Sequence, residues 1–428
     1  MKRYIAILLA ALIWLGLFPG QAVAQGEPPE ITSESAVLMD AKTGQVLYEK
    51  SMHMQLYPAS ITKILTVLLA LENGHLNDYI TMSSEAANNI KNGSSNIALE
   101  EGEQITLEQA VMASMLPSAN EACNGIAEHI GGSLAGFTRL MNQRARQAGA
   151  LNSNFINPNG LPDPNHLSTA FDMAMITRDA LKYDKFREII GTVRYTIPPT
   201  NKKTEARDLW SMHRMLTTNR FYYDGVEGGK TGYTQESKNT LVTVARRGDR
   251  ELIVVVMKSD NYADYKDTIA LFDYGFNEFA ETSIVPAVPP DGRAYLIQDV
   301  LNQHQDLNLK RLLLKGMNPQ EIVIDYETVD NDPLKEPDLL VKLYLNSSSS
   351  LMYADLGTIY LVNSSPKPVQ DTGGGTVLKV LKILAIVVLS VVAILFMIRW
   401  FFKLRKLRKK CNNRNKLRMS DFSQRRSK

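Results

Sequence analysis

The 428-residue sequence predicts an α+β protein with one large domain, a smaller β-rich domain and a C-terminal transmembrane helix. Residues 33–282 begin and end with β-prone hairpin patterns around a helical middle at 106–182, so the terminal strands are expected to form one sheet. Residues 284–363 contain short β-prone runs and no catalytic pattern. These runs lie at 321–325, 339–345 and 358–362.

The first 24 residues have the pattern of a secretory signal peptide. Lys2 and Arg3 form a positive start, residues 5–17 an apolar core, and Ala22-Val23-Ala24 a small-residue cleavage site. The core is short for a membrane span of about 20 residues, which favours cleavage over the alternative of an uncleaved N-terminal anchor.

The first strands and the first helix follow from local patterns. Apolar alternation on both sides of Lys42-Thr43-Gly44 predicts a β-hairpin with this tripeptide in its turn. The almost wholly apolar run at 61–71 follows Pro58-Ala59 and predicts a buried helix that begins near Ser60. Ser60 and Lys63 stand three residues apart, which places their side chains on one helix face and within reach of each other.

Two further patterns complete the large domain. Ser118-Ala119-Asn120 stands between two helix-like segments. Lys230-Thr231-Gly232 follows two glycines and leads into a β-prone run at 240–245, and a second run at 252–257 follows Gly248-Asp249. The two runs predict a hairpin whose first strand begins near Lys230.

None of these three short patterns is specific alone, because the chain contains further matches to each. They are Ser364-Ser365-Pro366-Lys367, Ser94-Ser95-Asn96, Ser237-Lys238-Asn239, Ser259-Asp260-Asn261 and Lys42-Thr43-Gly44. In residues 364–367, Pro366 excludes a helix that could hold the lysine near the serine. Residues 94–96 have the composition of a loop and residues 42–44 that of a turn, and residues 259–261 follow the third motif and are out of order. Order and context therefore select Ser60, Ser118 and Lys230.

Residues 60–63, 118–120 and 230–232 match, in order, the S-x-x-K, S-x-N and K-T-G motifs of penicillin-binding proteins and class A β-lactamases. From about Ser35 to about Phe276, the sequence resembles the D-alanyl-D-alanine carboxypeptidases of the low-molecular-weight penicillin-binding family. The phrases that carry the resemblance are residues 58–63, 130–133, 141–143, 157–161, 166–172 and 228–234. It implies a β-lactamase/transpeptidase-like domain with a five-stranded antiparallel sheet, flanking helices and a helical subdomain.

The chemistry expected of these residues is acyl transfer. Ser60 would attack the carbonyl of the penultimate D-alanine, and Lys63 can act as its base if burial keeps the amine neutral. Ser118 would relay the proton to the leaving amine. The resemblance also implies that penicillins, as mimics of the terminal dipeptide, acylate Ser60. No cofactor is expected.

The remaining motif residues are expected to bind the peptidoglycan stem peptide that ends in D-Ala-D-Ala. Asn120 would hold the substrate amide, and Lys230 and Thr231 the terminal carboxylate. Gly232 leaves room for the substrate backbone along the strand. The resemblance implies that the backbone N–H groups of Ser60 and Tyr233 stabilise the oxyanion.

Three positions depart from the family pattern. Ser237-Lys238 stands where many members have Ala-Gly, and a lysine there is similar to the sporulation-associated branch of the family. His213 stands where an asparagine is common upstream of the third motif. An arginine that some members carry before the final helix is not evident between Asn261 and Asp267, which leaves open what completes the carboxylate site.

Three other functions share these motifs. A class A β-lactamase would need a Glu-x-x-Leu-Asn-type loop to activate water, and none stands between Ala150 and Thr217. A D,D-transpeptidase or endopeptidase has the same motifs, although the low-molecular-weight architecture favours hydrolysis. The intact Ser60, Lys63, Ser118 and Lys230 argue against a catalytically inactive wall-binding protein.

The C-terminal region predicts membrane attachment. Residues 364–376 are rich in Ser, Pro and Gly and predict a flexible linker, and residues 377–402 are apolar over a membrane length. The basic tail at 403–428 is expected in the cytoplasm, which places the large domain outside the cell membrane in a single-pass protein.

Charge and cysteine content agree with export. Residues 399–428 carry 13 Lys and Arg and one acid, so with +12 there and +2 in the first 24 residues, the total of +3 leaves −11 for residues 25–398. The basic tail beside a span indicates topology rather than nucleic-acid binding. Cys123 and Cys411 would lie on opposite sides of the membrane and cannot pair, and no Cys/His cluster predicts a metal site.

Overall fold

The computed structural model describes residues 26–90, 93–216, 220–283, 310–317, 322–329, 338–345 and 355–361. These residues fall into two compact units. The predicted signal peptide (1–24), linker (364–376), transmembrane segment (377–402) and basic tail (403–428) lie outside the described residues. Within the described ranges, no helix combines the length and the apolar character that a membrane crossing requires.

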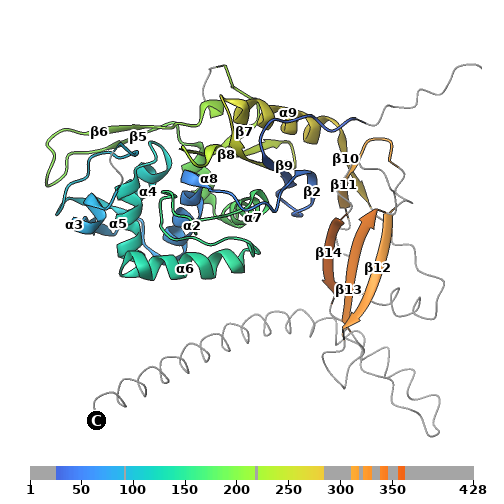
Figure 1. Cartoon of the computed structure of the whole chain (residues 1–428), viewed down its shortest axis with the longest axis horizontal. Coiled ribbons are helices and arrows are strands. Elements are labelled where there is room, and N and C mark those ends of the chain that lie inside the picture. The colour runs from blue at the N-terminus through green and yellow to red at the C-terminus, as the bar shows by residue number, and fades with distance from the viewer. Residues whose placement is uncertain are drawn as a thin grey trace, which may run out of the picture. The chain divides into compact units, whose positions relative to one another are not determined.

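A five-stranded antiparallel sheet forms the centre of the first unit (Figure 1). Its order is β2-β1-β9-β8-β7. The strands are β1 (Ser35–Asp40), β2 (Val46–Lys50), β7 (Val226–Thr234), β8 (Lys238–Arg247) and β9 (Arg250–Ser259). Because β1 pairs with β9, placing Val37 opposite Val255, the N-terminal hairpin and the C-terminal strands share one sheet, as the sequence predicts.

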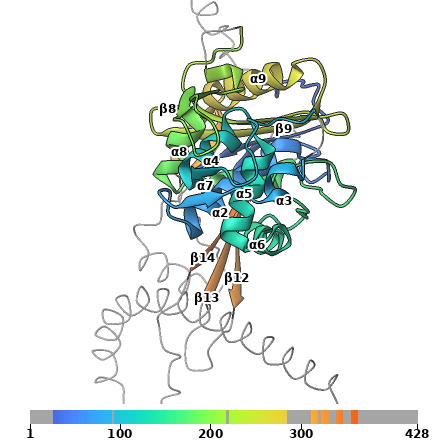
Figure 2. The same cartoon turned by 90° about the vertical axis from the view of Figure 1, so that its left-hand side faces the viewer.

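Helices cover both faces of this sheet (Figures 1 and 2). Helix α9 (Ala263–Asn277) packs on the face that carries Leu38 and Leu252, where Gly275 lets the helix approach closely. Helices α7 (Ala170–Ala180) and α8 (Asp184–Gly191) cover the other face. Burial on both faces explains why the strand pattern at 252–257 is continuously apolar rather than alternating.

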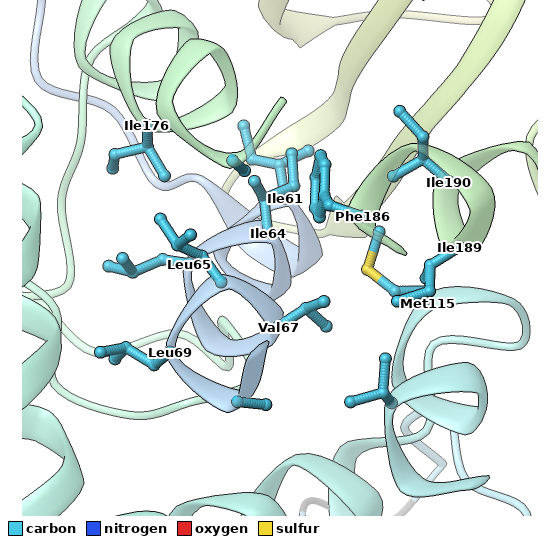
Figure 3. Packing of buried hydrophobic residues seen from close by; sticks show 14 of the residues in the cluster. Ile61, Ile64, Leu65, Val67, Leu69, Met115, Ile176, Phe186, Ile189 and Ile190 are labelled. Carbon is cyan, nitrogen blue, oxygen red and sulfur yellow. The ribbon is translucent and has the colours of Figure 1, made fainter. Parts of the chain in front are cut away.

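Helix α2 (Lys63–Asn73) lies inside the large domain, following the short 3-10 turn η1 (Ala59–Thr62). Its side chains pack against neighbouring helices: Ile176 of α7 lies on the side of Leu65, and Phe186 of α8 and Met115 lie on the side of Ile64 and Val67 (Figure 3). A helix packed on all sides must be apolar around its circumference, which confirms the buried helix predicted over 61–71.

The helical middle also forms as predicted, with one interruption. Within 106–182 it contains α4 (Leu107–Met115), α5 (Asn120–Gly131), α6 (Leu134–Gln147) and α7, and the short α3 (Ser84–Asn88) precedes it. Residues 148–169 then form no helix, because turn-forming residues such as Pro158 and Gly160 break the pattern. Two short ribbons accompany the helices: β3 (Tyr79–Thr81) with β4 (Gln104–Thr106), and β5 (Arg194–Ile197) with β6 (Arg207–Trp210). The 3-10 turn η2 (Arg214–Leu216) precedes β7.

The first unit extends beyond residue 282, where the sequence suggests its end. Strand β10 (Phe279–Ser283) pairs with β11 (Lys310–Leu314), which belongs to the first unit. The Gln45 side chain donates to the Leu312 carbonyl at 2.7 Å and accepts from its amide at 2.9 Å. Strand β11 therefore completes the large domain rather than the smaller one.

The second unit contains the strands expected from the late β-prone runs. They are β12 (Ile322–Val329), β13 (Asp338–Leu345) and β14 (Asp355–Leu361), the last from Gly357 onward. The three form one sheet with β13 in the middle, and β12 pairs with β13 in antiparallel fashion.

Candidate active site

Ser60 lies on a tightly constrained turn. It belongs to η1, so the α-helix begins at Lys63 rather than at the serine itself. Ala59 before it has a left-handed backbone (φ 50°), a conformation that L-residues adopt at a cost. Gly160 (φ 83°) packs on the Ala59 carbonyl, where a Cβ atom would stand 1.9 Å from the oxygen. The turn thus requires a residue without a side chain at position 160.

Lys63 points its amine at Ser60, as the i, i+3 spacing predicts. Its Nζ donates to Ser60 Oγ at 2.9 Å, Asn120 Oδ1 at 2.8 Å and the Asn159 carbonyl at 2.7 Å. Complete burial lowers the pKa of Lys63 to about 8, although the anionic forms of Cys123 and Glu121 act in the opposite direction. A substantial neutral fraction near neutral pH makes this amine suitable as a base.

Ser118 stands at the junction between α4 and α5, in the predicted context. Its backbone is left-handed (φ 67°), and its side chain lines the cleft beside Ser60. The hydroxyl is buried and has no hydrogen-bond partner among the described residues. A buried hydroxyl without a partner is costly unless a ligand supplies one, which fits a contact to the substrate. Asn120, two residues on, opens α5 with its side chain on Lys63.

Strand β7 brings Lys230, Thr231, Gly232 and Tyr233 to the edge of the sheet. A Cβ atom on Gly232 would lie 2.8 Å from the Ser60 amide nitrogen and 2.4 Å from Thr240 Oγ1. The glycine therefore lets the strand run directly against the Ser60 amide. This arrangement places Thr231, Gly232 and Tyr233 on the wall of the cleft that contains Ser60.

Lys230 is buried in the same region. Burial, together with the positive charge of Lys63, lowers its pKa to about 7. Its Nζ donates to the Thr231 carbonyl at 3.0 Å. His213 packs behind it, 3.0 Å from the position a Cβ of Gly229 would occupy, and hydrogen-bonds Thr243 at 3.1 Å. Burial lowers the pKa of His213 to about 4, so this imidazole is neutral at neutral pH.

These residues surround an open cleft of about 500 Å³. All the predicted catalytic and substrate-binding residues except Lys63 and Lys230 line it, while those two lysines lie beneath its surface. Gly93, Ser94 and Ser95 also line the cleft. The two serines belong to the Ser94-Ser95-Asn96 match, whose composition predicts a loop. The segment is a loop, but the Asn120 amide donates to the Ser95 carbonyl at 2.9 Å and fixes it beside the site.

Two residues of the site have no recognisable role in the sequence. The Asn159 carbonyl accepts from Lys63, and His166 holds the 156–160 loop against η1. Because His166 Nδ1 accepts from the Ile156 amide at 3.1 Å, its Nε2–H donates to Thr62 Oγ1 at 3.0 Å. Both residues occur in phrases that resemble the family, yet only the folded chain shows what they contact. Among the described residues, no cluster of three metal-ligating side chains is found.

A family model described as D-alanyl-D-alanine carboxypeptidase matches residues 22–261, more than half of the chain. The chain belongs to this family of serine peptidases. The match covers the central sheet, every predicted site residue from Ser60 to Tyr233, and the cleft-lining residues up to Asn239. The family resemblance inferred from the motifs is therefore confirmed.

The chain is also similar in sequence to individual D-alanyl-D-alanine carboxypeptidases. The chain is 35% identical to DacF of Bacillus subtilis (strain 168) over 292 residues, 65% of this chain and 72% of that protein. It is 32% identical to DacC of Escherichia coli (strain K12) over 299 residues, 66% of this chain and 71% of that protein.

Solved structures confirm the transpeptidase-type fold, with its antiparallel sheet and flanking helices. The crystal structure of the Streptomyces K15 DD-transpeptidase aligns with a TM-score of 0.55 and 28% identity, covering 59% of this chain and 99% of that one. A D-alanyl-D-alanine carboxypeptidase from Mycobacterium tuberculosis H37Rv aligns with a TM-score of 0.53 and 27% identity, covering 59% and 94%. The expected β-lactamase/transpeptidase-like domain is thus present.

Proposed function

We propose that this chain removes the terminal D-alanine from peptidoglycan stem pentapeptides as a membrane-anchored serine D-Ala-D-Ala carboxypeptidase. The observation that carries the proposal is the 2.9 Å hydrogen bond between Lys63 Nζ and Ser60 Oγ. It lies in a cleft whose wall is an edge strand bearing Thr231 and Gly232. An edge strand can pair with an extended peptide, and the nucleophile then faces the scissile bond.

Acylation begins when neutral Lys63 takes the proton of Ser60 and Ser60 Oγ attacks the carbonyl carbon of the penultimate residue. The negative oxygen is stabilised by the N–H groups of Ser60 and Tyr233, which the close approach at Gly232 brings together. Ser118 relays the proton held by Lys63 to the nitrogen of the terminal D-alanine as the peptide bond breaks, which leaves Lys63 neutral again. Free D-alanine leaves, and an ester to Ser60 remains.

Deacylation adds water to this ester and regenerates the serine. Asn120 holds the substrate amide, while Lys230 and Thr231 bind the terminal carboxylate during acylation. Penicillins carry a carboxylate and a strained amide in comparable positions, so they acylate Ser60 by the same steps.

The proposed location is the outer face of the cell membrane. It is supported by the signal-peptide pattern at 1–24, the apolar segment at 377–402 and the basic tail at 403–428. The acidic exported portion and the cell-wall substrate agree with this topology.

The proposal is tested with residues 25–376 and a pentapeptide ending in D-Ala-D-Ala. We expect the wild type to release free D-alanine and to be labelled by a fluorescent penicillin, and Ser60→Ala to lose both. Ser364→Ala, which alters the second S-x-x-K match, is the control and should behave as the wild type. A wild type that releases no D-alanine, or a Ser60→Ala variant that still takes the label, contradicts the proposal.

Transpeptidation is a second candidate, favoured by the similarity to a structure described as a DD-transpeptidase. In that reaction an amine replaces water as the acceptor. Adding an amino-acid acceptor to the same assay separates the two: a carboxypeptidase still forms mainly the shortened peptide, whereas a transpeptidase forms mainly the acceptor adduct.

A further inference from the structure

The loop at 156–161 supplies backbone acceptors to the helix that carries Lys63. The Asn159 carbonyl accepts from Lys63 Nζ at 2.7 Å, and the Pro158 carbonyl accepts from Thr66 Oγ1 of α2 at 2.6 Å. A protonated lysine has three N–H donors, and Lys63 has three acceptors, one of which is this carbonyl. The position of the loop therefore helps to decide where the Lys63 amine points.

Side-chain amides within the loop set its shape. Asn157 Oδ1 accepts from the Gly160 amide at 2.7 Å, and Asn157 Nδ2 donates to the Leu161 carbonyl at 2.9 Å. Asn159 Oδ1 accepts from the Leu161 amide at 3.1 Å. These contacts are internal, so the distance between the loop and η1 depends on a contact that joins the two segments.

His166 makes such a contact. Its ring is buried, with Phe155 packed edge-on at 5.6 Å between ring centres. Nδ1 accepts from the Ile156 amide at 3.1 Å, and Nε2–H donates to Thr62 Oγ1 at 3.0 Å. The imidazole thus joins the start of the loop to the residue directly before Lys63.

Only the neutral imidazole can make both hydrogen bonds, because Nδ1 must be without a proton to accept from an amide. Burial lowers the pKa of His166 to about 4, although the negative charge of Asp163 acts in the opposite direction and the positive charge of Lys63 in the same one. The two hydrogen bonds are therefore compatible at neutral pH.

We propose that His166 is a positioning residue for Lys63: by joining Ile156 to Thr62, it keeps the Asn159 carbonyl on the Lys63 amine and the amine on Ser60. The role deepens the proposed carboxypeptidase function and rests on it. His166 is not among the described residues that line the cleft, so it acts through Lys63 rather than on the substrate.

Loss of this contact should change both the rate and the pH dependence of acylation. An acceptor for the charged amine favours its protonated form, so withdrawal of the Asn159 carbonyl should lower the pKa of Lys63. A misplacement of about 1 Å can slow a reaction about 100-fold. Cys123, Glu121 and Lys230 also interact electrostatically with Lys63, and none of them is altered in the variants below.

The test uses the full-length chain purified in detergent. Thr62→Val removes the hydroxyl and keeps the shape of the side chain, and His166→Asn keeps an acceptor near Ile156 but is too short to reach Thr62. We expect each variant to be acylated by a fluorescent penicillin about 10- to 100-fold more slowly, with the acid limb of the rate, measured from pH 5.5 to 10, at lower pH. The double variant should be no slower than the slower single one, because both substitutions remove the same contact.

Thr177→Val is the matched control, because it also removes a buried helical hydroxyl, one that donates to the Met173 carbonyl of its own helix at 2.7 Å. It should lower the melting temperature and keep the wild-type rate and acid limb. If Thr62→Val and His166→Asn do the same, His166 serves only the stability of the fold, and the positioning role is overturned while the carboxypeptidase function stands. If His166→Asn does not fold, Thr62→Val decides alone. A folded wild type that neither takes the label nor releases D-alanine overturns the proposed function and this role with it.

Discussion

At the scale of single residues, the site places two lysines in the protein interior. In the unfolded chain each amine has an ordinary pKa, whereas burial lowers the folded value to about 8 for Lys63 and about 7 for Lys230. Between these values and about 10.4, the unfolded chain binds more protons, so this contribution to stability increases with pH across that window. Two buried amines therefore destabilise the fold at neutral pH. The same burial leaves part of the Lys63 amine neutral, which is the form that can act as a base.

The two pKa values predict a bell-shaped pH dependence of kcat/KM. The proposed acylation requires Lys63 without its proton and Lys230 with it, so the productive form is expected to be most populated between pH 7 and 8. Lys230→Arg keeps a permanent cation and should remove the alkaline limb, while the acid limb remains. Steady-state assays with a D-Ala-D-Ala peptide from pH 5.5 to 10 measure both profiles. An alkaline limb that survives in Lys230→Arg would assign that limb to another group.

At the scale of secondary-structure elements, function depends on how closely β7 approaches η1. Thr240 of β8 donates to the Pro58 carbonyl at 2.9 Å, which fixes the turn before the nucleophile to the sheet. Gly232 of β7 then contacts the Ser60 amide, where no side chain fits. The positions of the two proposed oxyanion donors, one on each element, follow from this packing.

Gly232→Ala should therefore impair catalysis more than folding. The added Cβ must push β7 away from Ser60, and loss of one oxyanion donor costs about 100- to 1,000-fold in rate in other enzymes. The matched control is Gly248→Ala in the β8–β9 turn, where φ is 59° and nothing lies within 4 Å of the added Cβ. That variant should lose about 1 kcal/mol of stability and keep its activity. Equal activity in the two variants would contradict this role for Gly232.

The sequence predicted those features that depend on local spacing or on order along the chain. Ser60 and Lys63 are three residues apart on continuous helical turns, so their contact follows from spacing alone. The Asn159 carbonyl accepts from Lys63 although the two residues are 96 positions apart. Because every residue type has a backbone carbonyl, the sequence does not show which one accepts this hydrogen bond. Arg214 also lines the cleft and was missed, because its place there depends on how η2 packs beside β7.

At the scale of the whole molecule, the large domain is completed by a strand distant from it in sequence. Residues of β11 lie beyond the expected boundary at 282, and nothing in a five-residue strand of two basic residues and three leucines shows which sheet it joins. Leu312, Leu313 and Leu314 are buried in the first unit, and Gln45 binds the Leu312 backbone through both ends of its amide. A buried side-chain amide would be left without partners if β11 were absent.

This arrangement predicts that a chain of residues 26–283 is markedly less stable than a chain of residues 26–321. Burying a leucine contributes about 1.5–3 kcal/mol, so losing three of them, together with the partners of Gln45, should lower the melting temperature by at least about 6 °C. Thermal unfolding of the two chains, followed by circular dichroism, measures the difference. Gln45→Ala in the longer chain should cause a smaller loss, because it removes the two hydrogen bonds but keeps the leucines buried. If the chain ending at residue 283 melts at the same temperature as the longer one, β11 is not part of the domain that carries Ser60.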